Sequence, residues 1–178
     1  SRIQIPVTWD PAAKCPAYND WAKKIIGDQL EDLEESASQM LDPSRTPPKA
    51  LLLFGPSRSG KSTFLRLLQA IAGEQNYSSV TLHQIVNNRF MAARAYGKML
   101  NAAADISNVH LDDIAIFKQL TGEDPVEADP KYGKNFKFTN RALFAFACNE
   151  LPTVGESSKA YSERMKPFRF DRSFAGKE

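Results

Sequence analysis

The sequence predicts an α/β fold, a mostly parallel β-sheet flanked by helices, with a short helical segment ahead of it. Three observations lead to this fold class. Short apolar runs, typical of buried parallel strands, recur at 50–54, 99–104 and 142–148. Stretches with helical periodicity lie between these runs. A glycine-rich turn joins the first run to the helical stretch after it, so strands and helices alternate as they do in layered α/β proteins.

Composition supports a globular domain. The 178 residues are 42% hydrophobic and 25% charged, which excludes a disordered, collagen-like or disulfide-scaffold chain. The net charge of +2 says little about partners. The longest apolar run, 142–148, is far shorter than the ~18 residues of a membrane span, so we expect no membrane contact. The N-terminal stretch SRIQIPVTWD lacks the apolar core of a secretory signal.

The N-terminal part is expected to be a separate, smaller unit. Residues 1–17 contain three prolines and predict an extended lead-in. A helix should follow, capped by Asn19 or Asp20 and continuing to Met40, with its acidic face solvated or, alternatively, in contact with another subunit. The proline-rich stretch 42–48 ends it. We therefore divide the chain into 1–48, an extension that is a possible oligomerisation collar, and the main domain 49–178.

The elements of the main domain follow in order from local periodicity. We expect strands at 50–54, 80–82, 99–104 and 142–148, helices at 61–71, 85–95 and 111–120, and a hairpin across 126–138.

The most specific motif is GPSRSGKS at 55–62, which fits the phosphate-binding loop pattern G-x-x-x-x-G-K-[ST]. Its glycines allow backbone N–H groups to point inward, and the helix after it directs its positive end at the phosphates. Lys61 is expected to reach the β- and γ-phosphates, and Ser62 to ligate Mg²⁺. The motif predicts binding of ATP with Mg²⁺ through Gly55, Pro56, Ser57, Arg58, Ser59, Gly60, Lys61, Ser62 and Thr63.

Polar residues follow two of the apolar runs. Asp105 ends the run 99–104, and Asn149 ends the run 142–148. Ligands of parallel sheets bind outside the carboxyl ends of the strands, so Asp105 is a candidate metal ligand and Asn149 a candidate phosphate contact. The alternatives are that Asp105 is an exposed loop residue or a helix cap, and that Asn149 is a turn residue.

A basic stretch with interleaved aromatic residues covers the expected hairpin. Lysines neutralise phosphates and aromatic rings stack on bases, so Lys131, Tyr132 and Lys134 at the turn are candidate DNA contacts, with a solvated face of the hairpin as the alternative. For Phe136 and Phe138 we expect the hydrophobic core instead.

In the order of these motifs the chain resembles the superfamily 3 helicases, in particular the primase-associated helicase domains of phages, plasmids and large DNA viruses. The resemblance rests on GPSRSGKS, YGKMLNAAAD at 96–105, FKQLTGEDPVEADPKYGKNFKF at 117–138, LFAFACNELP at 143–152 and SKAYSERMKPFRFDRSF at 158–174. It implies an AAA+ type P-loop NTPase core that assembles as a hexameric ring around single-stranded or forked DNA. It further implies a primase domain in the parent protein and a cytoplasmic location in a bacterium or a virus-infected host cell.

The resemblance also implies roles for single residues. It implies that Lys61 and Ser62 are the residues of the nucleotide-binding loop, that Asp105 is the acid of the metal site, and that Asn149 is the phosphate sensor. Arg164 becomes an arginine that acts across a subunit interface, and the hairpin turn faces the central channel. The implied function is an ATP-dependent DNA helicase motor for phage, plasmid or viral replication, with Lys61, Asp105, Asn149 and Arg164 as its catalytic residues.

Two other functions stay open. Family members often end the second strand with a pair of acids or a Glu, whereas here it ends Ala104-Asp105. A nucleotide-binding ring or DNA-binding module with little or no hydrolysis is therefore the first alternative. A small-molecule or nucleotide kinase with the same loop is the second, although the arginines of its lid are not evident between Asp105 and Asn149.

Overall fold

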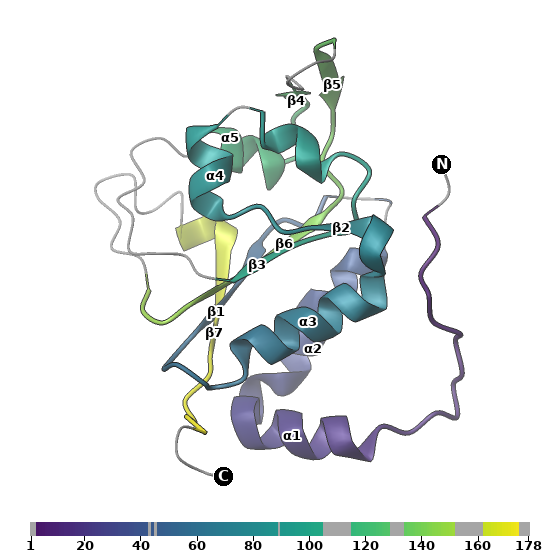
Figure 1. The fold of residues 1–178 in the computed structure, drawn as a ribbon, viewed down its shortest axis with the longest axis vertical. Coiled ribbons are helices and arrows are strands. Elements are labelled where there is room, and N and C mark those ends of the chain that lie inside the picture. The colour runs from purple at the N-terminus through teal and green to yellow at the C-terminus, as the bar shows by residue number, and fades with distance from the viewer. Residues whose placement is uncertain are drawn as a thin grey trace.

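The computed structural model of the protein describes residues 3–42, 44, 46–88, 90–104, 115–128, 134–151 and 162–174. A five-stranded sheet with the order β2-β3-β6-β1-β7 lies at its centre, and every pairing in this sheet is parallel. Figure 1 shows α1, α2 and α3 on one side of the sheet, and α4, α5 and a small hairpin on the other. The predicted α/β fold with a mostly parallel sheet is confirmed.

The strands of the central sheet are β1 (Ala50–Phe54), β2 (Tyr77–Ser78), β3 (Leu100–Ala104), β6 (Leu143–Cys148) and β7 (Met165–Arg169), and β4 (Val126–Ala128) and β5 (Phe136–Phe138) form the hairpin. The α-helices are α1 (Pro16–Ile26), α2 (Leu30–Ser38), α3 (Lys61–Ala72), α4 (Leu82–Asn87) and α5 (Ala115–Leu120). Short 3₁₀ turns are η1 (Gly27–Gln29), η2 (Gln39–Leu41), η3 (Glu74–Asn76) and η4 (Ala92–Ala95).

Two hydrophobic cores lie on the two faces of the sheet. Successive side chains of a strand point to opposite faces, so Leu51 and Leu53 of β1 face one core while Leu52 faces the other. The first core is closed by α1, α2 and α3, and the second by α4, α5 and the hairpin. Both faces of the sheet are therefore covered, which explains why its inner strands β1 and β6 are wholly apolar and β3 nearly so.

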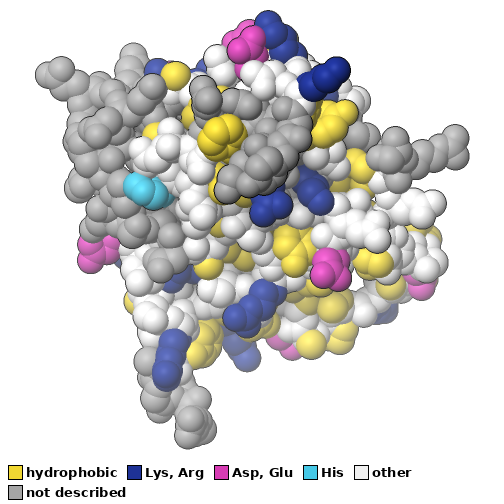
Figure 2. All heavy atoms as spheres, turned by 45° about the horizontal axis from the view of Figure 1, so that its top comes forward, with side chains coloured by type: hydrophobic (Ala, Val, Ile, Leu, Met, Phe, Trp, Pro, Cys, Tyr) yellow, Lys and Arg dark blue, Asp and Glu magenta, His cyan; other side chains and the backbone are white. Residues whose placement is uncertain are grey.

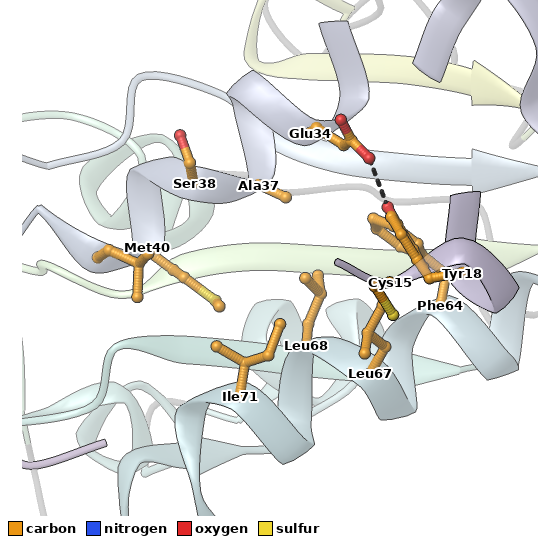
Figure 3. A pocket seen from close by; sticks show the side chains of 11 residues that line it. Cys15, Tyr18, Glu34, Ala37, Ser38, Met40, Phe64, Leu67, Leu68 and Ile71 are labelled. Carbon is orange, nitrogen blue, oxygen red and sulfur yellow. Dashed lines mark hydrogen bonds between the residues drawn. The ribbon is translucent and has the colours of Figure 1, made fainter. Parts of the chain in front are cut away.

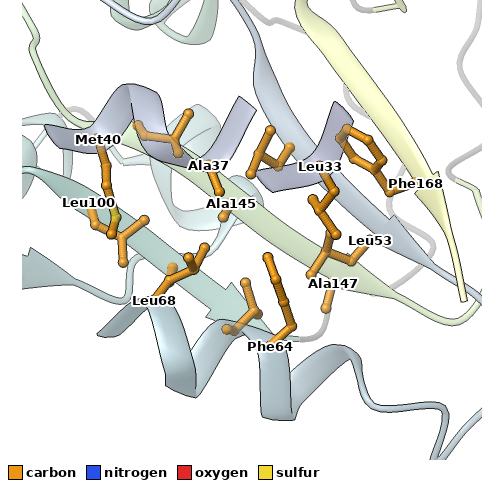
Figure 4. Packing of buried hydrophobic residues seen from close by; sticks show 14 of the residues in the cluster. Leu33, Ala37, Met40, Leu53, Phe64, Leu68, Leu100, Ala145, Ala147 and Phe168 are labelled. Atoms are coloured by element: carbon orange, nitrogen blue, oxygen red, sulfur yellow. The ribbon is translucent and has the colours of Figure 1, made fainter. Parts of the chain in front are cut away.

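The N-terminal helices share the first core with the sheet. In Figure 4, Leu33 and Ala37 of α2 and Met40 of the turn η2 point towards the buried side chains of the strands and of α3. Leu33 is fully buried, and Ala37 and Met40 are at most 5% exposed. The hydrophobic core of the main domain thus includes side chains from before residue 48.

The prediction of a single helix up to Met40 is wrong in two respects. The helix starts earlier, at Pro16, because proline suits the first helical position, where its missing N–H is not needed. It also ends at Ile26, because Gly27 adopts φ +61°, outside the helical region. A second helix, α2, then begins at Leu30.

Two predictions in the region 80–95 are also wrong. The strand expected at 80–82 is the shorter β2 at Tyr77–Ser78, and Leu82 instead begins α4. The helix expected at 85–95 ends at Asn87 and is followed only by the turn η4. The side chain of Asn88 accepts a hydrogen bond from the Phe90 N–H at 3.0 Å, and this local turn competes with helix formation.

Strand β7 was not expected from the sequence, because it has no apolar run. Among the described residues its one pairing partner is β1, so it lies at the edge of the described sheet, where Pro167 is tolerated because one side of an edge strand needs no backbone donor. Beyond the sheet, β4 and β5 pair antiparallel and confirm the hairpin, and the helix expected at 111–120 is described from Ala115 onward. Among the described residues, no helix has both the length and the apolar character that crossing a membrane requires.

Candidate functional site

The loop 55–60 between β1 and α3 has the backbone of an anion-binding turn. Three of its residues have positive φ: Gly55 at +144°, Arg58 at +57° and Gly60 at +96°. A non-glycine residue with positive φ is uncommon, and alternation of this kind turns successive N–H groups inward. Gly60 lies at the N-terminus of the 12-residue helix α3, whose first N–H groups have no partner within the helix. The local field at this turn therefore favours a negatively charged group.

The chain that follows β7 lies directly against this loop. The Phe170 N–H donates to the carbonyl of Phe54 at 2.8 Å, which brings the backbone of Phe170 over Gly55. A Cβ atom at Gly55 would lie 2.2 Å from the Phe170 carbonyl oxygen. Glycine is required here for two reasons, its φ and the close approach of a second backbone segment.

The side chain of Lys61 lies inside the loop. It is only 7% exposed, and its Nζ donates to the carbonyl oxygens of Gly55 and Pro56, at 2.7 Å each, and to Ser59 Oγ at 3.1 Å. Burial lowers the pKa of Lys61 because the ammonium loses hydration. Three oxygen acceptors compensate part of this loss and hold the lysine under the turn.

Cys148, at the end of β6, is the buried neighbour of this lysine. Its register partner is Phe54, the last residue of β1, so the thiol lies at the base of the loop. Burial raises the pKa of Cys148 to about 11, although the nearby Lys61 charge acts in the opposite direction. The thiol is therefore a neutral, apolar part of the site at neutral pH.

The strand register brings Asn149 and the end of β3 to the same edge of the sheet. Asn149 follows Cys148, is exposed, and comes at the same carboxyl edge as the loop. Ala104, the last residue of β3, pairs with Ala147 of β6, so β3 also ends at this edge. Asp105 itself lies outside the described residues. In the described part of the chain, no group of three or more His, Cys, Asp or Glu side chains is arranged to hold a metal ion.

Arg164 lies at the other end of the sheet. The next residue, Met165, pairs with Ala50 at the start of β1, whereas the loop follows the end of β1. Arg164 donates to the Thr121 carbonyl at 3.1 Å and to Thr121 Oγ1 at 3.4 Å. The length of the sheet separates it from the loop of its own chain, and its proposed action across a subunit interface stays a prediction.

The hairpin residues are only partly described. Lys131 and Tyr132 fall outside the described residues, and Lys134 is exposed. The expectation of core positions for Phe136 and Phe138 is confirmed, because both pack on the second core and contact the ring of Tyr96, with ring centres 4.8 and 5.3 Å apart. Figure 2 turns the hairpin end of the molecule forward; its Lys and Arg side chains are scattered over the visible face, with acidic ones among them.

Two aromatic residues of the site were missed by the sequence analysis. A hollow of about 320 Å³ beside the loop is lined by residues 58–63, by Trp21 of α1 and by Phe174 after β7. Its spacing identifies Trp21 only as a member of the expected N-terminal helix, and nothing in the sequence pattern marks Phe174. Proximity of these two residues depends on the tertiary fold, so no local signal was available.

A second hollow, of about 370 Å³, lies between α1, α2 and α3 (Figure 3). Its walls are mostly apolar, and Figure 3 shows Met40, Leu68 and Ile71 pointing into it. At its wall the Tyr18 hydroxyl donates a hydrogen bond to Glu34 Oε1 at 2.8 Å. Burial, with the Glu34 carboxylate as a second cause, raises the pKa of Tyr18.

Solved structures with a similar fold include the C-terminal region of NrS-1 and JCV helicase. The C-terminal region of NrS-1, in its A form apo structure, has a TM-score of 0.70 and 17% sequence identity over 90% of this chain. JCV helicase has a TM-score of 0.56 and 14% identity over 86% of this chain. This chain covers 39% and 43% of those two chains, respectively. At such identities the likeness establishes a shared, helicase-like fold.

A family of unknown function, DUF5906, matches residues 53–164. The match begins within β1, includes the whole loop with Lys61, and ends at Arg164, so it covers more than half of the 178 residues. The chain belongs to the DUF5906 family.

Proposed function

We propose that this chain is the ATPase core of a superfamily 3 type DNA helicase, which hydrolyses ATP at the subunit interfaces of a ring and moves along DNA. The observation that carries the proposal is the loop 55–60, folded around the buried Lys61 at the carboxyl edge of a parallel sheet. Burial of the Lys61 side chain under the turn and the positive φ of Arg58, a non-glycine residue, distinguish this loop from an ordinary glycine turn.

The residues present fit a magnesium-bound nucleoside triphosphate. Backbone N–H groups of the loop and the first turn of α3 suit the phosphates, and Lys61 suits the β- and γ-phosphate oxygens. Ser62 in the first turn of α3, with Asp105 directly after β3, suits Mg²⁺. When bound, Mg²⁺ neutralises charge that develops on the transferred phosphate. Lys61 and Asn149, at the same edge, would orient the γ-phosphate and the attacking water.

Assembly and DNA binding are further parts of this proposal. The helicase-like fold supports a ring, most simply a hexamer, in which Arg164 of one subunit would approach the nucleotide of its neighbour. The hairpin would contact single-stranded or forked DNA through Lys131, Tyr132 and Lys134. The parent protein is proposed to carry a primase domain and to act in phage, plasmid or viral replication.

The test is ATP hydrolysis with and without single-stranded DNA, with the mass of the particle recorded by light scattering in the same samples. The proposal predicts turnover by a large oligomer that DNA increases and that Lys61→Ala abolishes. Lys49→Ala is the matched control, because Lys49 is exposed and precedes β1, at the opposite end from the loop. A large oligomer that binds nucleotide without turnover would contradict the motor and select the non-hydrolysing ring instead.

A further inference from the structure

The hollow beside the phosphate loop has aromatic walls from two segments far apart in the sequence. Trp21 comes from α1 and Phe174 from the chain after β7, and between them lie residues 58–63 of the loop and of α3. A volume of about 320 Å³ is in the range of small-ligand pockets. The polar part of this hollow is the loop, and its apolar part is the pair of rings.

Helix α1 holds Trp21 firmly against the loop. A Cβ atom placed on Gly60 would lie 2.9 Å from Ile25 Cδ1 and 3.3 Å from Trp21 Cζ2, so both side chains pack directly on that glycine. Ala22 and Ile25 are buried in the first core and fix the helix in this position. Trp21 is half-buried, which leaves part of its ring at the hollow.

The segment 170–174 is tied to the loop by its own hydrogen bonds. The Phe174 N–H donates to the Arg58 carbonyl at 3.1 Å, and Ser173 Oγ donates to the Ser57 carbonyl at 3.0 Å. Phe174 nevertheless keeps 40% of its surface exposed. A large apolar side chain that is fixed in place but still exposed, at the rim of a polar loop, is suited to contact a ligand.

We propose that Trp21 and Phe174 form the binding site for the base of the nucleotide whose phosphates lie in the loop. This inference rests on the proposed function, since it places the other end of the same ligand. Base–aromatic stacking tolerates any base because every base has a π-face. The loss of one such contact typically weakens binding by roughly five- to a hundredfold. The site thus recognises nucleoside triphosphates in preference to bare polyphosphate.

The decisive comparison is between MgATP and magnesium tripolyphosphate, titrated calorimetrically into the full chain. We expect Trp21→Ala and Phe174→Ala each to lower the affinity for MgATP at least fivefold. Their affinity for tripolyphosphate should stay within twofold of the wild-type value. Trp21→Phe, which keeps an aromatic face, should retain most of the affinity. Trp9→Ala is the matched control, because Trp9 is 86% exposed and lies in the segment before α1.

A second readout needs no change at Trp21. The chain contains 2 tryptophans, so Trp9→Phe leaves Trp21 as the single indole fluorophore. We expect MgATP to quench its emission and tripolyphosphate to leave it unchanged.

Four results would overturn the inference. Trp21→Ala could lose affinity for both ligands equally, or keep its affinity for both. The emission of Trp21 could stay unchanged when MgATP is added, or the wild type could bind neither ligand. The last of these also overturns the proposed function, whereas the other three leave it standing. Lys61→Ala further distinguishes the base site from the phosphate site, since it should lower the affinity for both MgATP and tripolyphosphate.

Discussion

Gly55 fixes the path of the loop over the end of β1. Its φ of +144° and the Phe170 carbonyl, which would lie 2.2 Å from a Cβ, both exclude a side chain. Gly97 is a matched control, because its φ is +70° and a Cβ there would meet no atom within 4 Å. We expect Gly97→Ala to lower the free energy of unfolding by about 1–2 kcal/mol. Gly55→Ala should lower it by about 4 kcal/mol or more, as measured by urea unfolding. Equal losses would show that the contact with Phe170 is unimportant.

Cys148 should be unreactive in the folded protein. Its pKa of about 11, raised from 9.0 by burial, makes its thiolate roughly a hundredfold rarer at pH 8 than that of an ordinary thiol. Iodoacetamide at pH 8, followed by mass spectrometry, should label the exposed Cys15 and label Cys148 only after denaturation. Cys15→Ser should then remain unlabelled while folded. Labelling of both cysteines at the same rate would contradict the buried position of Cys148.

At the residue scale, the sequence predicted the position of the loop because the motif is defined by local spacing. Lys61 and the glycines of the loop are separated by fixed distances in the sequence, and the structure places Lys61 inside that loop. Trp21 and Phe174 are 153 positions apart in the sequence. They line the same hollow because α1 and the chain after β7 both pack on the loop. Such a pair has no sequence signature.

Hairpin β4–β5 is the element that the proposal assigns to DNA. Lys137 already pairs with Glu127 across the hairpin, at 3.0 Å, whereas Lys134 is exposed and nearer the turn. We expect Lys134→Ala to weaken binding of single-stranded DNA and to reduce the slope of log affinity against log salt by about 0.7. The measurement is fluorescence anisotropy at several salt concentrations, with Lys49→Ala as control. An unchanged slope would remove Lys134 from the interface.

Helices and strands were predicted well where the hydrophobic pattern is strong. They were predicted poorly where a helix cap or a place at the sheet edge determines the structure. The apolar strands β1, β3 and β6 were all expected from their runs. The start of α4 instead depends on Thr81, whose Oγ1 accepts from the Gln84 N–H at 3.2 Å while its own N–H donates to Gln84 Oε1 at 3.0 Å. This capping box is visible in the sequence as Thr81-x-x-Gln84. The prediction relied instead on the apolar character of 80–82 and placed a strand there. Strand β7 is specified by its pairing with β1, and pairing partners cannot be deduced from Pro167 and its neighbours.

At the scale of the whole molecule, the N-terminal helices complete the core of the sheet. Without residues 1–45, Leu51, Leu53 and Phe168 would lose the cover that α1 and α2 provide. We expect the truncated chain 46–178 to lose cooperative thermal unfolding and to bind a hydrophobic dye. The chain 13–178, which keeps both helices, should unfold within a few degrees of the full chain. Cooperative unfolding of 46–178 at an unchanged midpoint, followed by circular dichroism, would show that the sheet is stable alone.

The central claim is that the loop around Lys61 holds a nucleoside triphosphate, and equilibrium dialysis with radiolabelled MgATP tests it most directly. The wild type and Lys49→Ala should bind saturably and equally, and Lys61→Ala should bind at least tenfold more weakly while keeping its circular dichroism spectrum. Failure of the folded wild type to bind MgATP, or equal binding by Lys61→Ala, would contradict the account.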